Sequence, residues 1–173
     1  MDVKPSNFLV YENGDIKISD FGLIIKKDNP LKLEIIEGDC RYHSLELLNE
    51  SMNNHRVDFK TDIFALGLSI AELLFKLELP KNGPLWEDIR TPSFKFKDEI
   101  IENSDIKGID PNLLKLIYWM MSIDPKDRPS TTDLLKYVPE LEYRNLRLGN
   151  HQYKKAYTMS LSLIEEENEL SFL

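Results

Sequence analysis

Residues 2–22 read DVKPSNFLVYENGDIKISDFG, and this stretch decides how the first part of the chain folds. Residues 7–11 (NFLVY) and 16–18 (IKI) have the alternating, β-branched and aromatic composition of two short strands. Asn13 and Gly14 lie between them, and this dipeptide is the strongest short-range signal for a hairpin turn. The pattern therefore predicts a β-hairpin, with polar side chains immediately before and after it.

Four of these polar side chains suit one kind of chemistry. Asp2 can accept a proton from a hydroxyl nucleophile, and Lys4 supplies a positive charge beside a transferring phosphoryl group. Asn7 and Asp20 offer oxygen ligands of the kind that Mg²⁺ prefers together with phosphate. If the hairpin brings the four into one cleft, they favour phosphoryl transfer; otherwise they are ordinary turn and cap residues.

The remainder of the chain is predicted to be mainly helical. Residues 61–77 are apolar on nearly every face, which is typical of a buried helix, and Thr61 and Asp62 are the expected caps. Ser130, with Asp133 three positions later, resembles a capping box at the start of another helix. The full set of expected helices is 44–50, 61–77, 86–90, 112–123 and 130–137.

Composition limits the classes of function. The 173 residues are 42% hydrophobic, a level typical of a globular domain. The net charge of −8 argues against a nucleic-acid-binding surface. The longest apolar run, residues 63–71, is too short to cross a membrane. The single cysteine, Cys40, cannot form an internal disulfide, so we expect a reducing compartment, nucleus or cytoplasm. We also expect the protein to be a monomer.

The order of motifs resembles eukaryotic protein kinases. Residues 2–7 (DVKPSN) are similar to the catalytic loop of that family, and residues 20–22 (DFG) to its metal-binding triplet. Later segments agree in order: 44–46 (SLE), 62–67 (DIFALG) and 124–130 (DPKDRPS). The resemblance implies that Arg128 pairs with Glu46.

This resemblance also implies a fold, cofactors and roles. It predicts a protein-kinase-like C-terminal lobe (α+β), mainly α with a small β-hairpin, over residues 1–140. A tail at 141–173 follows, for which a packed helix is one interpretation. ATP and Mg²⁺ are the implied cofactors. The implied roles are Asp2 as catalytic base, Lys4 at the phosphate, Asn7 and Asp20 on Mg²⁺, and Leu9 beneath the adenine.

Further segments are similar to the Wee-type mitotic inhibitory kinases. They are residues 37–42 (EGDCRY), 60–66 (KTDIFAL), 79–83 (LPKNG) and 86–90 (WEDIR). Such kinases phosphorylate cyclin-dependent kinases, so a cyclin-dependent kinase is the implied protein substrate. Lys4 by itself favours Ser/Thr substrates, whereas the subfamily favours tyrosine, and the choice between them stays open.

The chain is expected to hold the large lobe alone. Its seven glycines contain no G-x-G-x-x-G, the phosphate-covering loop of the family's N-terminal lobe. We therefore expect the N-terminal lobe to be absent, Met1 to be an internal methionine of a longer kinase, and the isolated chain to be inactive. The rival hypothesis is a non-catalytic, pseudokinase-like module that binds a partner through the surface near residues 37–42 and 85–95.

Overall fold

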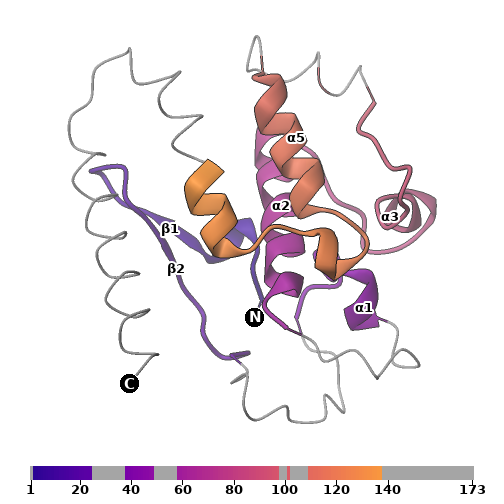
Figure 1. The fold of residues 1–173 in the computed structure, drawn as a ribbon. Helices are drawn as coiled ribbons and strands as arrows, with labels where there is room; N and C mark the ends of the chain where they lie inside the picture. Colours follow the sequence, from indigo (N-terminus) through magenta and orange to yellow (C-terminus); the bar gives the residue numbers. More distant parts are fainter. Residues whose placement is uncertain (1, 25–37, 49–57, 98–100, 102–108, 138–173) are drawn as a thin grey trace, which may run out of the picture. The chain divides into compact units, whose positions relative to one another are not determined.

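The structure is a computed structural model that describes residues 2–24, 38–48, 58–97, 101 and 109–137. Here the chain is mainly helical with one small antiparallel sheet, as the sequence predicts (Figure 1). The expectations about Met1 and about a tail at 141–173 lie outside the described residues. The elements are, in order, η1 (Pro5–Asn7), β1 (Phe8–Val10), β2 (Ile16–Ile18), α1 (Leu45–Leu48), α2 (Lys60–Phe75), α3 (Pro84–Asp88), α5 (Pro111–Met120) and η3 (Pro125–Asp127), with residues 131–137 also helical.

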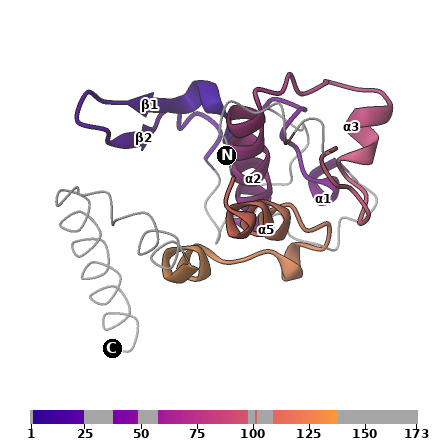
Figure 2. The same ribbon diagram turned by 90° about the horizontal axis from the view of Figure 1, so that it is seen from above.

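Contacts divide the chain into two units, Met1–Leu135 and Lys136–Leu173, and all the labelled elements belong to the first. Within this unit, the hairpin β1–β2 lies on one side of α2, and α1 and α3 lie on the other (Figures 1 and 2). None of the described helices is long and apolar enough to cross a membrane.

The predicted hairpin is confirmed, with Leu9 opposite Lys17 in the register of β1 and β2. A three-residue loop closes it: the Gly14 N–H donates to the Tyr11 carbonyl at 2.9 Å, and the Tyr11 N–H donates to the Asp15 carbonyl at 2.9 Å. Gly14 has a φ of 86°, in the left-handed region that a glycine adopts at little cost. The Asn-Gly signal therefore marks the position of the turn, but the loop has three residues, and of the two only Gly14 has a positive φ.

The long helix α2 starts one residue earlier than predicted, after an N-cap residue, Phe59, whose side chain makes no capping bond. The Asp58 carboxylate accepts the Lys60 N–H at 2.7 Å. Thr61 and Asp62, the predicted caps, instead lie inside the first turn. The sequence-based expectation is wrong here because an aspartate three positions upstream of Thr61 already satisfies a free N–H at the helix start.

Helices α2 and α5 form the centre of the core. Phe64 and Leu68 on α2 and Ile117 on α5 are completely buried. A Cβ added to Gly67 would lie 3.0 Å from Met120 Cβ and 3.0 Å from Met121 Cγ. The glycine therefore lets the two helices approach closely, and α2 is buried on several faces, as its composition predicts.

The other helices agree with the sequence in place but not in length. Helix α3 begins at Pro84, two residues before the predicted start, since proline is favoured in a first helical turn. Helix α5 begins at Pro111, behind an Asp110 carboxylate that accepts the Asn112 N–H at 2.8 Å, and ends at Met120 rather than residue 123. Helix α1 covers Leu45–Leu48, while residues 49–50 of its predicted range lie outside the described residues.

The predicted capping box before residues 131–137 is confirmed. The Ser130 N–H donates to Asp133 Oδ2 at 2.9 Å, and the Asp133 N–H donates to Ser130 Oγ at 3.1 Å. Each residue thus satisfies a donor of the other at the helix start.

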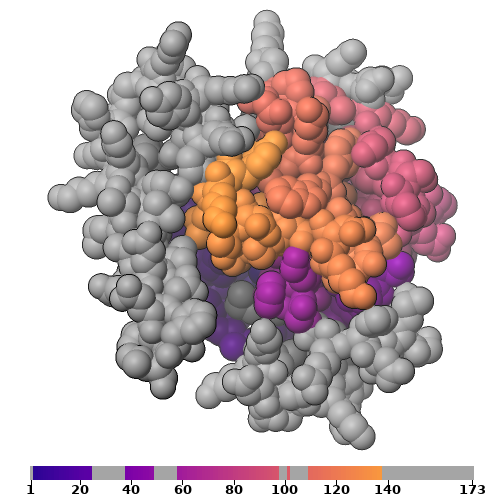
Figure 3. Space-filling model, in the orientation of Figure 1, coloured from indigo at the N-terminus to yellow at the C-terminus, as the bar shows by residue number. Residues whose placement is uncertain are grey.

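Arg128 fixes α1 and η3 to the start of α2, as the motif resemblance implies. Its guanidinium donates to both carboxylate oxygens of Glu46. It also donates to the carbonyls of Lys60, Ser122 and Ile123 at 2.6–3.0 Å. In Figure 3 the orange surface around residues 125–135 adjoins the purple and magenta surface of the segments that Arg128 bridges.

Candidate active site

Asp2 lies at the centre of the predicted site. Lys4 Nζ forms an ion pair with Asp2 Oδ2, and the Asp39 N–H donates to Asp2 Oδ1 at 3.1 Å. The two side chains are mostly buried, with 10% of Asp2 and 21% of Lys4 exposed. The carboxylate is therefore held on one side by a cation two residues along the chain, and on the other by a backbone donor 37 residues away.

The surroundings of Asp2 keep its carboxylate charged. Burial opposes the charged form, but hydrogen bonds from Lys4 and from the Asp39 N–H outweigh it, so the pKa of Asp2 lies below its usual value of 3.8. At neutral pH the side chain is an anion that can accept a hydrogen bond or a proton.

Asn7 is joined to Asp2 and, through the hairpin, to the residue before Asp20. Its Nδ2 donates to the Asp2 carbonyl at 2.7 Å, which leaves its amide oxygen as the end able to bind a cation. The Asn7 carbonyl accepts the Ser19 N–H at 2.8 Å and the Ser19 hydroxyl at 3.0 Å. Two bonds across the hairpin thus set where the chain leaves β2.

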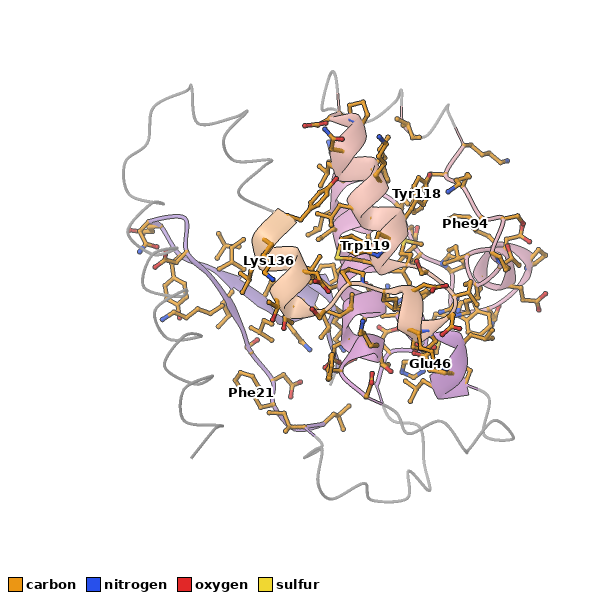
Figure 4. All side chains as sticks on the ribbon, viewed as in Figure 1. Phe21, Glu46, Phe94, Tyr118, Trp119 and Lys136 are labelled. Atoms are coloured by element: carbon orange, nitrogen blue, oxygen red, sulfur yellow. The ribbon has the colours of Figure 1, made fainter. Side chains whose placement is uncertain are left out.

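Asp20 sits at a turn with an uncommon backbone conformation. Its φ is 60°, in the left-handed region that aspartate enters more readily than most residues. Its Oδ1 accepts the Gly22 N–H at 3.3 Å. Phe21 follows with 58% of its surface exposed, and Figure 4 shows it on the segment after β2, apart from the side chains around Glu46.

The structure therefore brings Asp2, Lys4 and Asn7 together directly, and it ties Asp20 to them through Ser19. Leu9, the predicted residue beneath the adenine, lies on β1 and is 48% exposed.

Gly38 lies close to the Asp2 carboxylate. Its φ is +107°, which disfavours any L side chain, and a Cβ there would lie 3.2 Å from Asp2 Oδ1. The same Cβ would lie 3.2 Å from His43 Nε2. Glycine at this position gives the Asp39 N–H access to the Asp2 carboxylate.

The donor set fits Mg²⁺ bound together with a nucleotide. Asn7 and Asp20 offer an amide oxygen and a carboxylate, and Mg²⁺ in proteins is commonly held by one or two such groups plus phosphates and water. In the described part of the chain, no three His, Cys, Asp or Glu side chains gather as a self-sufficient metal site. The residues therefore suit a metal whose other ligands arrive with the substrate.

Sequence reasoning missed the residues that hold the segment 39–43. Asp39 forms a bidentate ion pair with Arg41, and this pair lowers the pKa of Asp39 to about 2. The Tyr42 hydroxyl donates to Glu72 at 2.5 Å, and burial followed by this bond raises the pKa of Tyr42. The Asp39-x-Arg41 spacing was the available signal for the first pair.

A cavity of about 460 Å³ lies elsewhere in the unit, between the segment after α3 and the end of α5. Its lining includes Phe94, Tyr118, Met121, Asp124 and Asp127. Figure 4 labels two of these side chains, Phe94 and Tyr118. It includes none of the residues predicted to act in catalysis or to bind the nucleotide or the metal. We therefore place the candidate active site around Asp2 and not in this cavity.

Comparison with known proteins agrees with the motif order. The model of the protein kinase domain matches residues 1–138. The chain is 35% identical over 144 residues to the membrane-associated tyrosine- and threonine-specific cdc2-inhibitory kinase of Drosophila melanogaster, an alignment that covers 83% of this chain and 25% of that protein.

Two further relatives carry related names. The Wee1-like protein kinase of Arabidopsis thaliana is 38% identical over 137 residues, which are 79% of this chain and 24% of that protein. The mitosis inhibitor protein kinase wee1 of Schizosaccharomyces pombe is 32% identical over 153 residues, 78% of this chain and 16% of that protein. The chain spans a quarter or less of the length of these relatives.

Proposed function

The chain belongs to the protein kinase family, and we propose that the protein carrying it transfers the γ-phosphoryl group of ATP to a hydroxyl of a cyclin-dependent kinase. In this proposal the hydroxyl oxygen forms the new bond to the γ-phosphorus, the bond to ADP breaks, and the hydroxyl proton passes to Asp2. The proposed activity is that of an inhibitory, Wee-like kinase in cell-cycle control.

The arrangement around Asp2 is the observation that carries this proposal. A buried anion with a lysine on one oxygen and a backbone N–H on the other is a fixed acceptor for the substrate hydroxyl. Phosphoryl transfer needs positioning and charge neutralisation more than covalent chemistry, so such fixed charges supply most of what the reaction requires.

The other residues take supporting roles in the proposal. Lys4 lies beside the oxygen of Asp2 and would share its charge with the transferring phosphoryl group. Asn7 and Asp20 would hold Mg²⁺, which neutralises charge on the phosphates of ATP. Leu9 would lie beneath the adenine, as the family resemblance implies, and at 48% exposed on β1 it is accessible to a ligand.

The proposed substrate class rests on the relatives. One is named a tyrosine- and threonine-specific cdc2-inhibitory kinase and another a mitosis inhibitor protein kinase. At 32–38% identity, the match supports a cyclin-dependent kinase as the substrate of this protein too. Whether tyrosine or threonine receives the phosphoryl group is a question for the assay.

The test is phosphorylation of a purified cyclin-dependent kinase by the native protein, at its natural length, with ATP and Mg²⁺. Asp2→Asn keeps the size of the side chain but removes its charge, so we expect kcat to fall by about 10²–10³-fold or more. Glu78→Gln is the matched control, since it neutralises an exposed carboxylate that follows the end of α2 and is not one of the predicted site residues. Phosphopeptide mapping identifies the modified residue.

Each result decides between the two hypotheses. Phosphoryl transfer that depends on Asp2 and survives Glu78→Gln supports the kinase. No transfer by the wild-type protein, together with stable binding to the cyclin-dependent kinase, would instead favour the non-catalytic binding module.

A further inference from the structure

Arg90 holds the backbone of a neighbouring segment without any acidic partner among the described residues. Its Nε donates to the His43 carbonyl at 2.9 Å, and its NH1 donates to the Trp86 carbonyl at 2.7 Å. Its NH2 donates to the carbonyls of Cys40 and Arg41 at 3.1 and 3.0 Å. Three of these four acceptors belong to the segment 40–43, so one side chain fixes the path of that backbone.

Burial makes this arrangement costly for a cation. Arg90 is 5% exposed, and this burial lowers the pKa of its guanidinium to about 10. Neutral carbonyls compensate a buried charge less well than a carboxylate does. A cation–π contact with Trp86 offsets part of this desolvation energy, since the guanidinium carbon lies 3.8 Å from the centroid of the ring.

Trp86 reinforces the same contact. Its indole Nε1–H donates to the Cys40 carbonyl at 3.0 Å, the oxygen that Arg90 also binds. Trp86 lies in α3, and Arg90 lies four residues after Trp86, just beyond the end of that helix. Both side chains donate to the same Cys40 carbonyl. Together they form what we name the α3 clamp, consisting of Trp86 and Arg90.

The segment held by the α3 clamp leads directly to the candidate catalytic residue. The residue before Cys40 is Asp39, whose N–H donates to Asp2 Oδ1. Loosening the carbonyls of residues 40–43 would therefore release a donor on Asp2 as well as the surface next to it. A displacement of about 1 Å in such a site can cost about 100-fold in rate.

We infer that Arg90 is a positioning residue for the protein substrate: it fixes segment 39–43, whose partly exposed residues 39–41 form the surface on which the substrate chain lies beside Asp2. This inference rests on the proposed kinase function and adds a residue far from the reacting atoms. Because Arg90 acts on the segment beside Asp2 and not on Leu9 or Asp20, it controls the use of the protein substrate more than that of ATP.

The experiment is steady-state kinetics on the native, full-length protein with a cyclin-dependent kinase as substrate, varying substrate and ATP separately. Arg90→Met removes all four hydrogen bonds, and Arg90→Lys keeps the charge but loses the planar fork that reaches several carbonyls at once. Lys115→Met is the matched control, since Lys115 is an exposed cation on α5, outside the clamp and outside the surface near residues 37–42 and 85–95.

We expect Arg90→Met to raise the KM for the protein substrate about tenfold or more and to lower kcat, with the KM for ATP within about twofold of wild type. Arg90→Lys should recover only a small part of the loss. If Arg90→Met does not fold, Trp86→Phe gives the test, since it deletes the bond to Cys40 and keeps an aromatic face; its protein KM should rise by a few fold.

The outcomes separate this inference from the proposed function. An active wild-type protein whose protein KM and kcat are unchanged in Arg90→Met, or in Trp86→Phe where that variant is used, overturns the inference and leaves the kinase assignment intact. Equal rises in the two KM values overturn it as well, because they indicate a general loosening of the lobe. A wild-type protein without phosphoryl transfer overturns the proposed function, and this inference with it.

Discussion

Glu46 and Arg128 lie 82 residues apart and are joined by two hydrogen bonds, 2.6 Å from NH1 to Oε1 and 2.9 Å from NH2 to Oε2. The arginine side chain is completely buried and the glutamate is 11% exposed. The Phe64 ring lies 5.0 Å from the guanidinium carbon. A buried pair of this kind tethers distant segments, and the loss of one partner leaves the other charge uncompensated.

Arg128→Met should therefore destabilise the protein by about 3–5 kcal/mol, because it leaves the Glu46 carboxylate buried without its cation. Three backbone carbonyls lose a donor in addition. Urea unfolding of the native protein measures the change. Lys126→Met, a change to an exposed cation two residues earlier, should stay within about 0.5 kcal/mol of wild type; similar midpoints for the two variants would contradict the tethering role.

Gly67→Ala tests the close approach of α2 and α5. The added methyl meets Met120 and Met121 at 3.0 Å, and overpacking of this kind costs about 1–3 kcal/mol. Better helix propensity returns at most about 1 kcal/mol, so a net loss and a melting temperature lower by a few degrees are expected. Leu73→Ala on the same helix, at a side chain 59% exposed, should change the melting temperature less. A stabilised Gly67→Ala protein would show that the helices part freely.

Lys76→Gly should stabilise the protein. Lys76 ends α2 with φ 50° and ψ 44°, and its N–H donates to the Glu72 carbonyl. An L side chain in this left-handed conformation costs about 1 kcal/mol, which glycine avoids. Lys76→Ala keeps the cost and is the control. Thermal melting compares the two variants, and no gain for glycine over alanine would count against a strained helix end.

The parts of this fold that the sequence predicts are those in which side chains recognise side chains or set a local turn. Asn13-Gly14 predicts the hairpin, Ser130 with Asp133 predicts the capping box, and Arg128 pairs with Glu46 as the resemblance implies. In each case the residue types that make the contact can be read directly in the sequence.

What the sequence does not predict depends on backbone atoms. Arg90 binds four carbonyls, and a carbonyl is present at every position, so no residue type marks its partners. The hydrogen bond from the Asp39 N–H to Asp2 cannot be predicted from the sequence for the same reason, since every residue except proline has a backbone N–H. The start of α2 shifts because Asp58, which lies in a polar and irregular stretch, makes the capping bond.

Acid should destabilise the protein through carboxylates whose pKa is lowered by folding. Burial raises the pKa of Glu46, but Arg128 outweighs it and holds the value below 4.5. For Asp39 the Arg41 pair lowers the pKa from 3.8 to about 2. A lowered pKa gives stability that is present above the unfolded value and lost as pH falls through the folded one. The free energy of unfolding should thus fall between about pH 4.5 and pH 2.

Asp39→Asn isolates one part of that loss. It should remove at most about 2 kcal/mol of stability at pH 6, and flatten the curve between pH 3.8 and about 2. Arg41→Met should flatten the same window, because it deletes the partner that lowers the pKa. Denaturant unfolding at several pH values measures both curves; a curve for either variant parallel to that of wild type would show that the pair contributes nothing to acid stability.

Lys4 should control both the rate and the protonation of Asp2. Lys4→Met removes the charge beside the proposed phosphoryl group, so kcat of the native protein should fall by about 10²–10³-fold. It also leaves burial as the main influence on Asp2, which raises the pKa of that carboxylate. As the solution is acidified, the residual activity of Lys4→Met should therefore begin to fall at a higher pH than wild-type activity does. Lys4→Arg keeps a cation, so its activity should fall over the same acidic pH range as that of wild type. If the pH–activity curve of Lys4→Met is lower than that of wild type but has the same shape, Lys4 acts on the phosphoryl group and leaves the protonation of Asp2 unchanged.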